Sequence, residues 1–390
     1  MSASETPLKI ARVITVPMGV MGSRSFLSAL ADDPAVELDL IVSPGFGFEV
    51  LEELGLRRLI PVEMKRGISP LHDLLSIWTL TRIFRAEKYD VVHSHTPKAG
   101  LVTSIAGFLA RTPVRIHSYT GQRWETLTGP KRTVVMGSER LIGLLNTVNL
   151  TDSHAQVTRL SEVGIVSAGR ISCLGDGSLA GVDIHRFRPE LCSEHRVPQR
   201  QLLGIPEDHL VFLFTGRVVG DKGVHELVDA FTGLAAKYER LSLIVLGPLE
   251  TEDDPVRDET LQTIKRHPRI HSVPYSPTPE VVMAASDLLV LPSYREGFPT
   301  VVLEAAAVGL PSIVARFGGA DEVVVDGVTG RVVEKRMVVP LRDAMEEAIV
   351  SPERRDGWRT ASLRRVREAF SQERMVDLYL DFYRQKRGRS

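Results

Sequence analysis

Two carboxylates separated by seven residues stand out in the stretch "REGFPTVVLEAAAVG", where Glu304 lies inside an apolar run and Glu296 precedes it. The apolar run predicts a short helix over residues 300–308 that ends at Gly309. A carboxylate among apolar neighbours needs hydrogen-bond donors or a cation, because burying an unpaired charge is costly. Sugar hydroxyls are suitable donors. The alternative is a structural ion pair with an arginine such as Arg316.

A second candidate site is the turn "FTGRVVGDKG", which follows an apolar strand and opens a helix. Gly216 allows a tight turn, and Arg217 and Lys222 flank the loop. Free amides at a helix start and two cations beside it favour a diphosphate. The alternative is that both cations are solvated loop charges. Pro299, expected at a first helical position, predicts a second helix start that could bind the same phosphates.

These turns must be positioned by parallel strands, and the sequence predicts two sheets of such strands. Apolar runs alternate with helical segments in each half, which is typical of doubly wound α/β domains. The expected strands are 11–16, 38–43, 90–95 and 114–119 in the first half, and 210–216, 241–247, 287–293 and 311–315 in the second. Ligands of such sheets bind beyond the carboxyl ends of the strands, so we expect two domains that face each other across a cleft.

The expected boundary lies in "GVDIHRFRP", which has the glycine, charges and proline of a linker. We therefore expect an N-terminal domain over residues 1–185 and a C-terminal domain over 186–370. The final segment, about 371–388, has apolar residues at helical spacing and is expected to pack back onto a domain.

Composition excludes several classes of function. The formal net charge is −1 over 390 residues, which gives no global attraction to nucleic acid. Two cysteines without paired spacing argue against a zinc site or a disulfide scaffold and suit a cytoplasmic protein. The N-terminus lacks the features of a signal peptide, and no run of about 18 apolar residues predicts a membrane span.

The N-terminal half carries weaker candidates. Gly19 and Gly22 precede a helix expected from about residue 23, although strand-to-helix turns use glycine for shape in any doubly wound protein. His93 and His95 lie two apart on an expected strand and His117 on the next, but no further ligand lies at useful spacing, so no metal is expected. Hydrogen bonding by His117 near a reacting centre is the preferred interpretation.

Residues 63–90 and 123–140 mix basic side chains with large apolar ones. Such a surface would suit an anionic lipid-linked acceptor and a peripheral contact with the cytoplasmic face of a membrane. The alternative is an ordinary amphipathic helix with a solvated basic face.

The order of these motifs resembles the retaining GT-B glycosyltransferases of family four. "EGFPTVVLE" matches the family's E-x₇-E motif, and "FTGRVVGDKG" is similar to its donor-phosphate loop. The segments "LIVLGPLE", "AASDLLVLPSYREGFP" and "GLPSIVARFGGADEVVVDGVTGRVV" follow in the family's order. "VVHSHTPKAGL", "HSYTGQRW" and "GSLAGVDIHRF" further resemble a bacterial branch that builds surface polysaccharides and related glycans.

The resemblance implies a nucleotide-sugar donor bound mainly by the C-terminal domain, with no cofactor and no metal. Arg217 and Lys222 would then bind the diphosphate and stabilise the leaving group. Glu304 would bind the ribose hydroxyls and Glu296 the transferred sugar. The other implied donor contacts are Gly19, Gly22, Gly216, Gly297, Phe298, Thr300 and Val301.

The resemblance also implies retention at the anomeric carbon and an acceptor that is a glycan or a lipid-linked intermediate. Many relatives have a histidine where this sequence has Thr120, so the residue that supports the transferred sugar is either His117 or Thr120. Base contacts are expected from the backbone near residues 274–277, with uridine favoured. Two rivals stay open: a nucleotide-sugar epimerase of the same architecture, which needs no acceptor, and a non-catalytic partner subunit.

Overall fold

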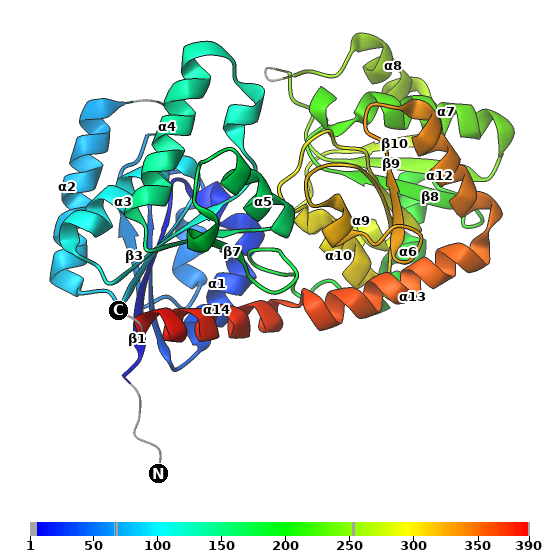
Figure 1. The fold of residues 1–390 in the computed structure, drawn as a ribbon. Coiled ribbons are helices and arrows are strands. Elements are labelled where there is room, and N and C mark those ends of the chain that lie inside the picture. The colour runs from blue at the N-terminus through cyan, green and yellow to red at the C-terminus, as the bar shows by residue number, and fades with distance from the viewer. Residues whose placement is uncertain (1–5, 66, 68, 252–253, 389–390) are drawn as a thin grey trace. The chain divides into compact units, whose positions relative to one another are not determined.

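The computed structural model describes residues 6–65, 67, 69–251 and 254–388, and the chain divides into two compact units (Figure 1). Unit 1 comprises Met1–Gly181 and Gln372–Ser390, and unit 2 comprises Val182–Ser371. Each unit is built on a parallel sheet with helices packed on it. The expected class, two doubly wound α/β units, is confirmed. The division falls slightly before the boundary expected at residue 185.

Unit 1 contains a seven-stranded sheet in the order β3-β2-β1-β4-β5-β6-β7. Its strands are β1 (Leu8–Ile14), β2 (Val36–Val42), β3 (Arg58–Pro61), β4 (Val91–His95), β5 (Val114–Tyr119), β6 (Val148–Thr151) and β7 (Ile171–Cys173). Its helices are α1 (Arg24–Asp32), α2 (Pro70–Glu87), α3 (Pro97–Ala110), α4 (Gly129–Leu145), α5 (His154–Glu162) and α14 (Gln372–Arg387).

Alternation along β1 separates two cores in unit 1. Ile10 belongs to a cluster that includes α1 and α14, and Ala11 belongs to a cluster that includes α2 and α3. Because successive side chains of a strand point to opposite faces, these helices cover opposite faces of the sheet. Tyr379 and Tyr383 of α14 are fully buried in the first cluster, so the final helix is part of the unit 1 core.

Unit 2 contains a six-stranded sheet in the order β10-β9-β8-β11-β12-β13. Its strands are β8 (Leu210–Thr215), β9 (Leu241–Leu246), β10 (Ile270–Val273), β11 (Leu288–Leu291), β12 (Ser312–Ala315) and β13 (Gly330–Val333). Its helices are α6 (Glu190–Leu203), α7 (Val224–Lys237), α8 (Asp258–Arg266), α9 (Pro279–Ala284), α10 (Thr300–Val308), α11 (Ala320–Val323), α12 (Val338–Val350) and α13 (Pro352–Ala369).

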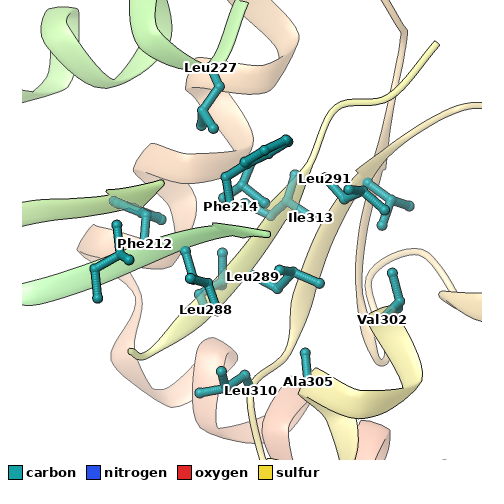
Figure 2. Close-up of a cluster of buried hydrophobic side chains, with 14 of the residues drawn as sticks. Phe212, Phe214, Leu227, Leu288, Leu289, Leu291, Val302, Ala305, Leu310 and Ile313 are labelled. Atoms are coloured by element: carbon teal, nitrogen blue, oxygen red, sulfur yellow. The ribbon is translucent and has the colours of Figure 1, made fainter. Parts of the chain in front are cut away.

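The core of unit 2 fixes the direction of α10, the helix predicted from the apolar run. Val302 and Ala305 face the sheet and lie near the side chains of β11 and β12, as Figure 2 shows. The helix ends at Gly309, whose φ of 91° is in the left-handed region that glycine adopts without strain. This packing holds α10 against β11 and β12, two inner strands of the sheet.

No helix of the described residues is long and apolar enough to cross a bilayer.

Candidate active site

The candidate donor site lies where the strand order of unit 2 reverses. Strand β8 pairs with β9 on one side and with β11 on the other, and both pairings are parallel. Arg217 follows β8, and Glu296 lies in the loop that follows β11. Ligands of open α/β sheets bind beyond the carboxyl ends of the strands at such a reversal. The structure thus brings the two sequence motifs to one place.

The turns at this reversal are tight because glycines let backbone segments touch. A Cβ atom on Gly247 would lie 1.9 Å from the carbonyl oxygen of Gly216, and one on Gly223 would lie 2.2 Å from that of Pro292. Gly223 also has a φ of 69°, which glycine adopts without strain. Helix α7 therefore begins directly beside the end of β11, and Lys222 lies next to the loop after that strand.

Lys222 and Glu296 form an ion pair across the two turns. Lys222 Nζ lies 2.6 Å from Glu296 Oε1, and the side chains are only 16% and 15% exposed. The sequence predicted separate partners for them, the diphosphate for the lysine and the transferred sugar for the glutamate. Their contact places a cation and a hydrogen-bond acceptor side by side at the reversal.

Arg217 is paired with a carboxylate from the neighbouring turn. Its Nη1 lies 2.8 Å from Glu250 Oε2, and the amide of Val218 donates to the carbonyl of Pro248 over 2.8 Å, so the two loops run together. The guanidinium is half exposed. An exposed ion pair of this kind contributes roughly 0–1 kcal/mol. The arginine therefore remains available to a more highly charged anion.

Tyr294 holds the loop after β11 against the start of α7. Its hydroxyl donates to the carboxylate of Glu226 at 2.8 and 2.9 Å, and its amide donates to the carbonyl of Asp221 over 2.9 Å. Burial and the neighbouring carboxylate raise the pKa of Tyr294, so the phenol stays protonated and keeps donating. The sequence did not reveal this contact, because Tyr294 and Glu226 lie on different elements.

The start of α10 has no side-chain cap from the described residues. Pro299, expected at the first helical position, is instead the extended N-cap residue with φ −75° and ψ 100°, and the helix begins at Thr300. The ψ of Pro299 lies outside the helical region, although its carbonyl accepts from the amide of Val302 over 3.0 Å, as an N-cap carbonyl does. The helix start can still present amides to an anion.

The remaining residues expected near this helix start lie together in the loop and first turn. Thr300 and Val301 are partly buried, and Gly297 precedes them. The ring of Phe298 lies 5.5 Å from that of Phe370, so its side chain anchors the loop to the unit 2 core. Only the backbone groups of Gly297 and Phe298 are suited to a ligand contact.

Glu304 has no ion pair or hydrogen-bond partner among the described residues. Arg316, the partner considered from sequence, instead pairs with Asp321 at 2.7 Å and Glu334 at 3.1 Å. Burial raises the pKa of Glu304 to about 7, against an opposing effect of the Arg186 charge. A buried carboxylate that has no partner in the described part of the chain is suited to accept hydrogen bonds from a ligand.

Two charged residues near Glu304 were missed by sequence reasoning. Arg186 Nη2 lies 2.8 Å from Glu280 Oε2, and both charges act on Glu304. Arg186 lies in the segment that was interpreted as a linker, and Glu280 lies in the first turn of α9, where acids are common. No signal in a single sequence connects them with α10.

The turn after β1 differs from the expected glycine loop. Residues Pro17–Gly19 and Met21–Ser23 form two short 3₁₀ turns, and α1 begins at Arg24. Neither Gly19 nor Gly22 has a φ in the left-handed region. Gly22 is exposed, and a Cβ atom there would meet no described atom within 4 Å. Gly22 therefore borders open space, whereas a Cβ atom on Gly19 would lie only 3.3 Å from Ile14 Cγ2.

His117 is enclosed in the core of unit 1. Its Nδ1 lies 3.0 Å from Ser94 Oγ, its ring lies edge-on to Tyr119 at 4.7 Å, and a Cβ atom on Gly100 would lie 2.5 Å from its Cε1. Burial lowers the pKa of His117 to about 3, so the ring is neutral. Thr120, by contrast, is exposed at the end of the strand. The placement speaks against a contact between His117 and substrate.

His93 and His95 are used for packing and hydrogen bonding. Their rings stack at 4.4 Å, His93 contacts Tyr383 and Ser118 at 2.7 Å each, and His95 accepts from Arg12. Among the described residues, no group of three or more histidine, cysteine or acidic side chains could hold a metal ion.

Two family descriptions match the chain in order. "Glycosyl transferase 4-like domain" matches residues 23–177, and "Glycosyl transferases group 1" matches residues 196–365. The first match lies within unit 1, and the second contains Arg217, Lys222, Glu296 and Glu304.

Individual proteins with known names are similar over most of their length. The capsular polysaccharide biosynthesis glycosyltransferase CapM of Staphylococcus aureus is 29% identical over 84% of this chain and 86% of that protein. The UDP-Gal:alpha-D-GlcNAc-diphosphoundecaprenol alpha-1,3-galactosyltransferase of Escherichia coli is 25% identical over 86% of each.

Among solved structures, HepE of Anabaena in complex with UDP superposes with a TM-score of 0.80. It is 21% identical, and the alignment covers 97% of this chain and all of HepE. This likeness concerns the fold. The ordered family matches show that the chain belongs to the group 1 glycosyltransferases of family four, retaining enzymes with the GT-B fold that transfer a sugar from a nucleotide sugar.

Proposed function

We propose that unit 2 binds the nucleoside diphosphate sugar, with UDP as the nucleotide, and that unit 1 binds an acceptor that is a lipid-linked glycan. The observation that carries the donor site is the meeting of Lys222, Glu296 and the start of α10 at the strand reversal of unit 2. A cation, an acceptor and a helix N-terminus together suit a diphosphate joined to a sugar.

Each residue has a role that follows from its chemistry. Arg217 and Lys222 bind the diphosphate, together with amides at the start of α10, near Thr300 and Val301. Glu304, about one turn further along the helix, accepts hydrogen bonds from the ribose hydroxyls. Glu296 holds the transferred sugar, together with the amides of the two residues that follow it, Gly297 and Phe298.

The reaction replaces one bond at the anomeric carbon with another on the same face. The acceptor oxygen forms a bond to that carbon as the bond to the β-phosphate oxygen breaks, and the acceptor proton passes to the departing phosphate oxygen. Negative charge grows on the diphosphate as it leaves. Arg217 and Lys222 stabilise that charge, which is electrostatic catalysis of the leaving group.

In unit 1, Gly19 and Gly22 of the turn after β1 are proposed as donor contacts, and the open space at Gly22 supports this proposal. Of the two candidates for supporting the transferred sugar, Thr120 is the better one. It is exposed at a strand end, where ligands of such sheets bind, whereas His117 is buried.

The named relatives support the choice of substrates. HepE is bound to UDP in its structure, and the E. coli relative is named as using UDP-galactose and a diphosphoundecaprenol-linked acceptor. CapM is named for capsular polysaccharide biosynthesis. A UDP-sugar donor and a polyprenyl diphosphate acceptor are therefore the first pair to test.

A lipid-linked acceptor requires access to a membrane, and α2 offers a suitable surface. Leu71, Leu74, Leu75 and Trp78 recur at helical spacing, and each is more than half exposed. The guanidinium of Arg82 lies 4.7 Å from the centre of the Trp78 ring. Exposed apolar residues next to a cation suit the surface of an anionic bilayer.

Vesicle sedimentation tests this surface. The protein should bind vesicles that contain an anionic lipid more strongly than zwitterionic vesicles, and the Leu74→Ser/Leu75→Ser variant should lose this binding. Leu202→Ser is the matched control, because Leu202 is equally exposed but lies in unit 2. Unchanged binding of the double variant would exclude α2 as the docking surface.

The donor proposal is tested by calorimetric titration with UDP, GDP, dTDP and ADP. We expect selective binding of UDP that weakens in Arg217→Ala and Glu304→Ala. Arg240→Ala is the matched control, because Arg240 also forms an exposed ion pair in unit 2, with Asp208 at 3.2 Å. If none of the four nucleotides binds, the donor site is wrongly assigned.

Turnover separates the transferase from its rivals. A transferase consumes UDP-sugar and releases UDP much faster in the presence of an acceptor than in its absence. An epimerase would convert the sugar without acceptor, and a non-catalytic subunit would do neither.

A further inference from the structure

Arg186 lies in the segment that was expected to be a linker, yet hydrogen bonds hold both its backbone and its side chain. The side chain of Asp183 accepts hydrogen bonds from the amides of His185 and Arg186, each at 3.0 Å. The Arg186 guanidinium then donates to the carbonyl of Pro277 over 2.9 Å and to Glu280 over 2.8 Å. One side chain therefore ties this segment to the loop before α9 and to α9 itself.

Glu280 is itself buried, and its helix packs against α10. Arg186 and Glu280 are the charged groups that act on Glu304, in opposite directions. Other elements packed on α10 present groups elsewhere: Arg359 of α13 lies near Gly309 at the far end, and the thiol of Cys192 in α6 faces the carbonyl of Val308. Glu304 thus has one positive and one negative neighbour.

We propose that Arg186 is a positioning residue for the nucleoside end of the donor, which holds the loop at residues 274–277 in place and offsets the negative charge of Glu280 beside Glu304. The inference rests on the proposed function, in which Glu304 binds the ribose. Arg186 lies outside the donor-binding motifs, yet in this proposal it controls whether the Glu304 carboxylate can accept hydrogen bonds.

The chemistry of the guanidinium suits both tasks. Arg186 uses two donors in different directions, toward a backbone carbonyl and toward a carboxylate, and keeps its charge at every working pH. Both bonds are donated by the same nitrogen, Nη2, so lysine, with three donors on one nitrogen, is the conservative variant that retains the charge. Loss of the positive charge would leave two carboxylates facing each other, so Glu304 would take up a proton more readily.

Protonation of Glu304 matters because of what the ribose offers. Two hydroxyls donate to an ionised carboxylate, whereas the acid form has one oxygen occupied by a proton. Since burial raises the pKa of Glu304 to about 7, affinity for the donor should fall as the pH falls through neutrality. This gives the role of Arg186 a signature that packing alone would not produce.

The experiment is calorimetric titration with UDP-glucose between about pH 5.5 and 8.5. The diphosphate of this ligand is esterified at both ends, so its charge stays constant over this range, while Glu304 with its raised pKa titrates. The variants are Arg186→Gln, Arg186→Lys, Glu280→Gln and Glu304→Gln. Arg186→Gln should raise the midpoint of the affinity profile by about one pH unit. Affinity near pH 7 would then be about five-fold weaker, as the ionised fraction of Glu304 falls.

The companion variants make the test specific. Glu280→Gln should shift the midpoint the opposite way and tighten binding near neutrality by about two-fold, because a negative charge is removed. Arg186→Lys should keep the midpoint of the unmodified protein, and Glu304→Gln should flatten the profile. Thermal melting of each variant checks that it is folded.

Different failures have different meanings. If Arg186→Gln and Glu280→Gln both weaken binding equally at every pH, Arg186 only holds the loop, and the inference is overturned while the donor site stands. If the unmodified protein binds neither UDP nor UDP-glucose at any pH, the proposed function fails, and the inference falls with it.

Discussion

Lys222 Nζ lies 2.6 Å from Glu296 Oε1, so the cation and the carboxylate of the candidate donor site neutralise each other. Each comes from a turn that follows a different strand, and Gly223 makes the contact possible by its close approach to Pro292. A donor with a diphosphate and a sugar offers a better partner to each member of the pair. Binding would therefore exchange one ion pair for two ligand contacts.

The first prediction is that Lys222→Ala lowers kcat by about 10² to 10³, because the lysine stabilises charge that develops on the leaving diphosphate. The variant also leaves Glu296 without its partner in a largely buried position. The measurement is release of UDP under saturating donor, with a thermal melt of the same sample.

Glu296→Gln is the companion variant. It keeps the shape of the side chain and frees Lys222, so we expect donor binding to persist while turnover falls. If both variants lose only thermal stability, with kcat unchanged, the pair is structural and Lys222 is not part of the catalytic machinery.

The second prediction concerns Glu250, whose carboxylate pairs with Arg217 at 2.8 Å. Glu250→Gln removes a competitor for the guanidinium, so UDP should bind about two- to five-fold more tightly, the factor expected for an exposed ion pair. Calorimetric titration at low and high salt measures the effect, which should shrink as salt rises.

Asp208→Asn is the control for Glu250→Gln, since Asp208 pairs with Arg240 elsewhere on unit 2. It should leave the affinity for UDP unchanged. Equal or weaker UDP binding by Glu250→Gln would mean that Arg217 does not reach the diphosphate.

The third prediction follows from the buried network that connects α14 to the sheet of unit 1. Arg12 donates to the hydroxyl of Tyr383 over 3.0 Å, so the tyrosine proton is free to reach His93 Nδ1 at 2.7 Å. Tyr383→Phe removes both contacts and leaves buried polar groups unpaired. The free energy of unfolding should fall by about 1–3 kcal/mol.

Urea unfolding measures this loss, with Tyr238→Phe as the control. Tyr238 loses one hydrogen bond to Glu346 at the surface of unit 2, so its effect should be smaller. If the two variants are equally stable, the network does not stabilise unit 1.

Much of the fold could be predicted because long apolar strands have an unmistakable pattern. All eight expected strands are present in the sheets. The strands that sequence reasoning missed, β3, β6, β7, β10 and β13, have only three or four residues each and lie toward the edges of the sheets. Strands β11 and β12 are equally short, but they lie inside the sheet and belong to longer apolar runs, whereas the missed strands mix polar and apolar residues.

The candidate site was predictable in type but not in its pairings. The E-x₇-E spacing and the cations after β8 were visible, because they are local in sequence. The contact between Lys222 and Glu296 joins residues 74 positions apart and depends on backbone approach at Gly223. Likewise, alternation on a strand could not tell whether His117 faces a ligand or the core.

The fourth prediction is that unit 1 loses stability in mild acid. Burial lowers the pKa of His93, His95 and His117 in the folded protein, whereas unfolded histidine takes up a proton near pH 6.5. Glu139 offsets the effect of about one histidine. Burial raises the pKa of Glu139 to about 7, so the folded protein holds a proton on this residue that the unfolded chain releases. At about pH 5 to 5.5 the unfolded chain then binds about two more protons than the folded one.

Two extra protons correspond to a loss of about 2.7 kcal/mol in the free energy of unfolding for each pH unit. Urea unfolding of a Trp358→Phe variant measures it, because Trp78 and Trp124 then report on unit 1 alone. His95→Gln keeps an acceptor for Arg12 and should lower the slope by about one proton. A slope that His95→Gln does not alter would mean that His95 is not held neutral in the folded state.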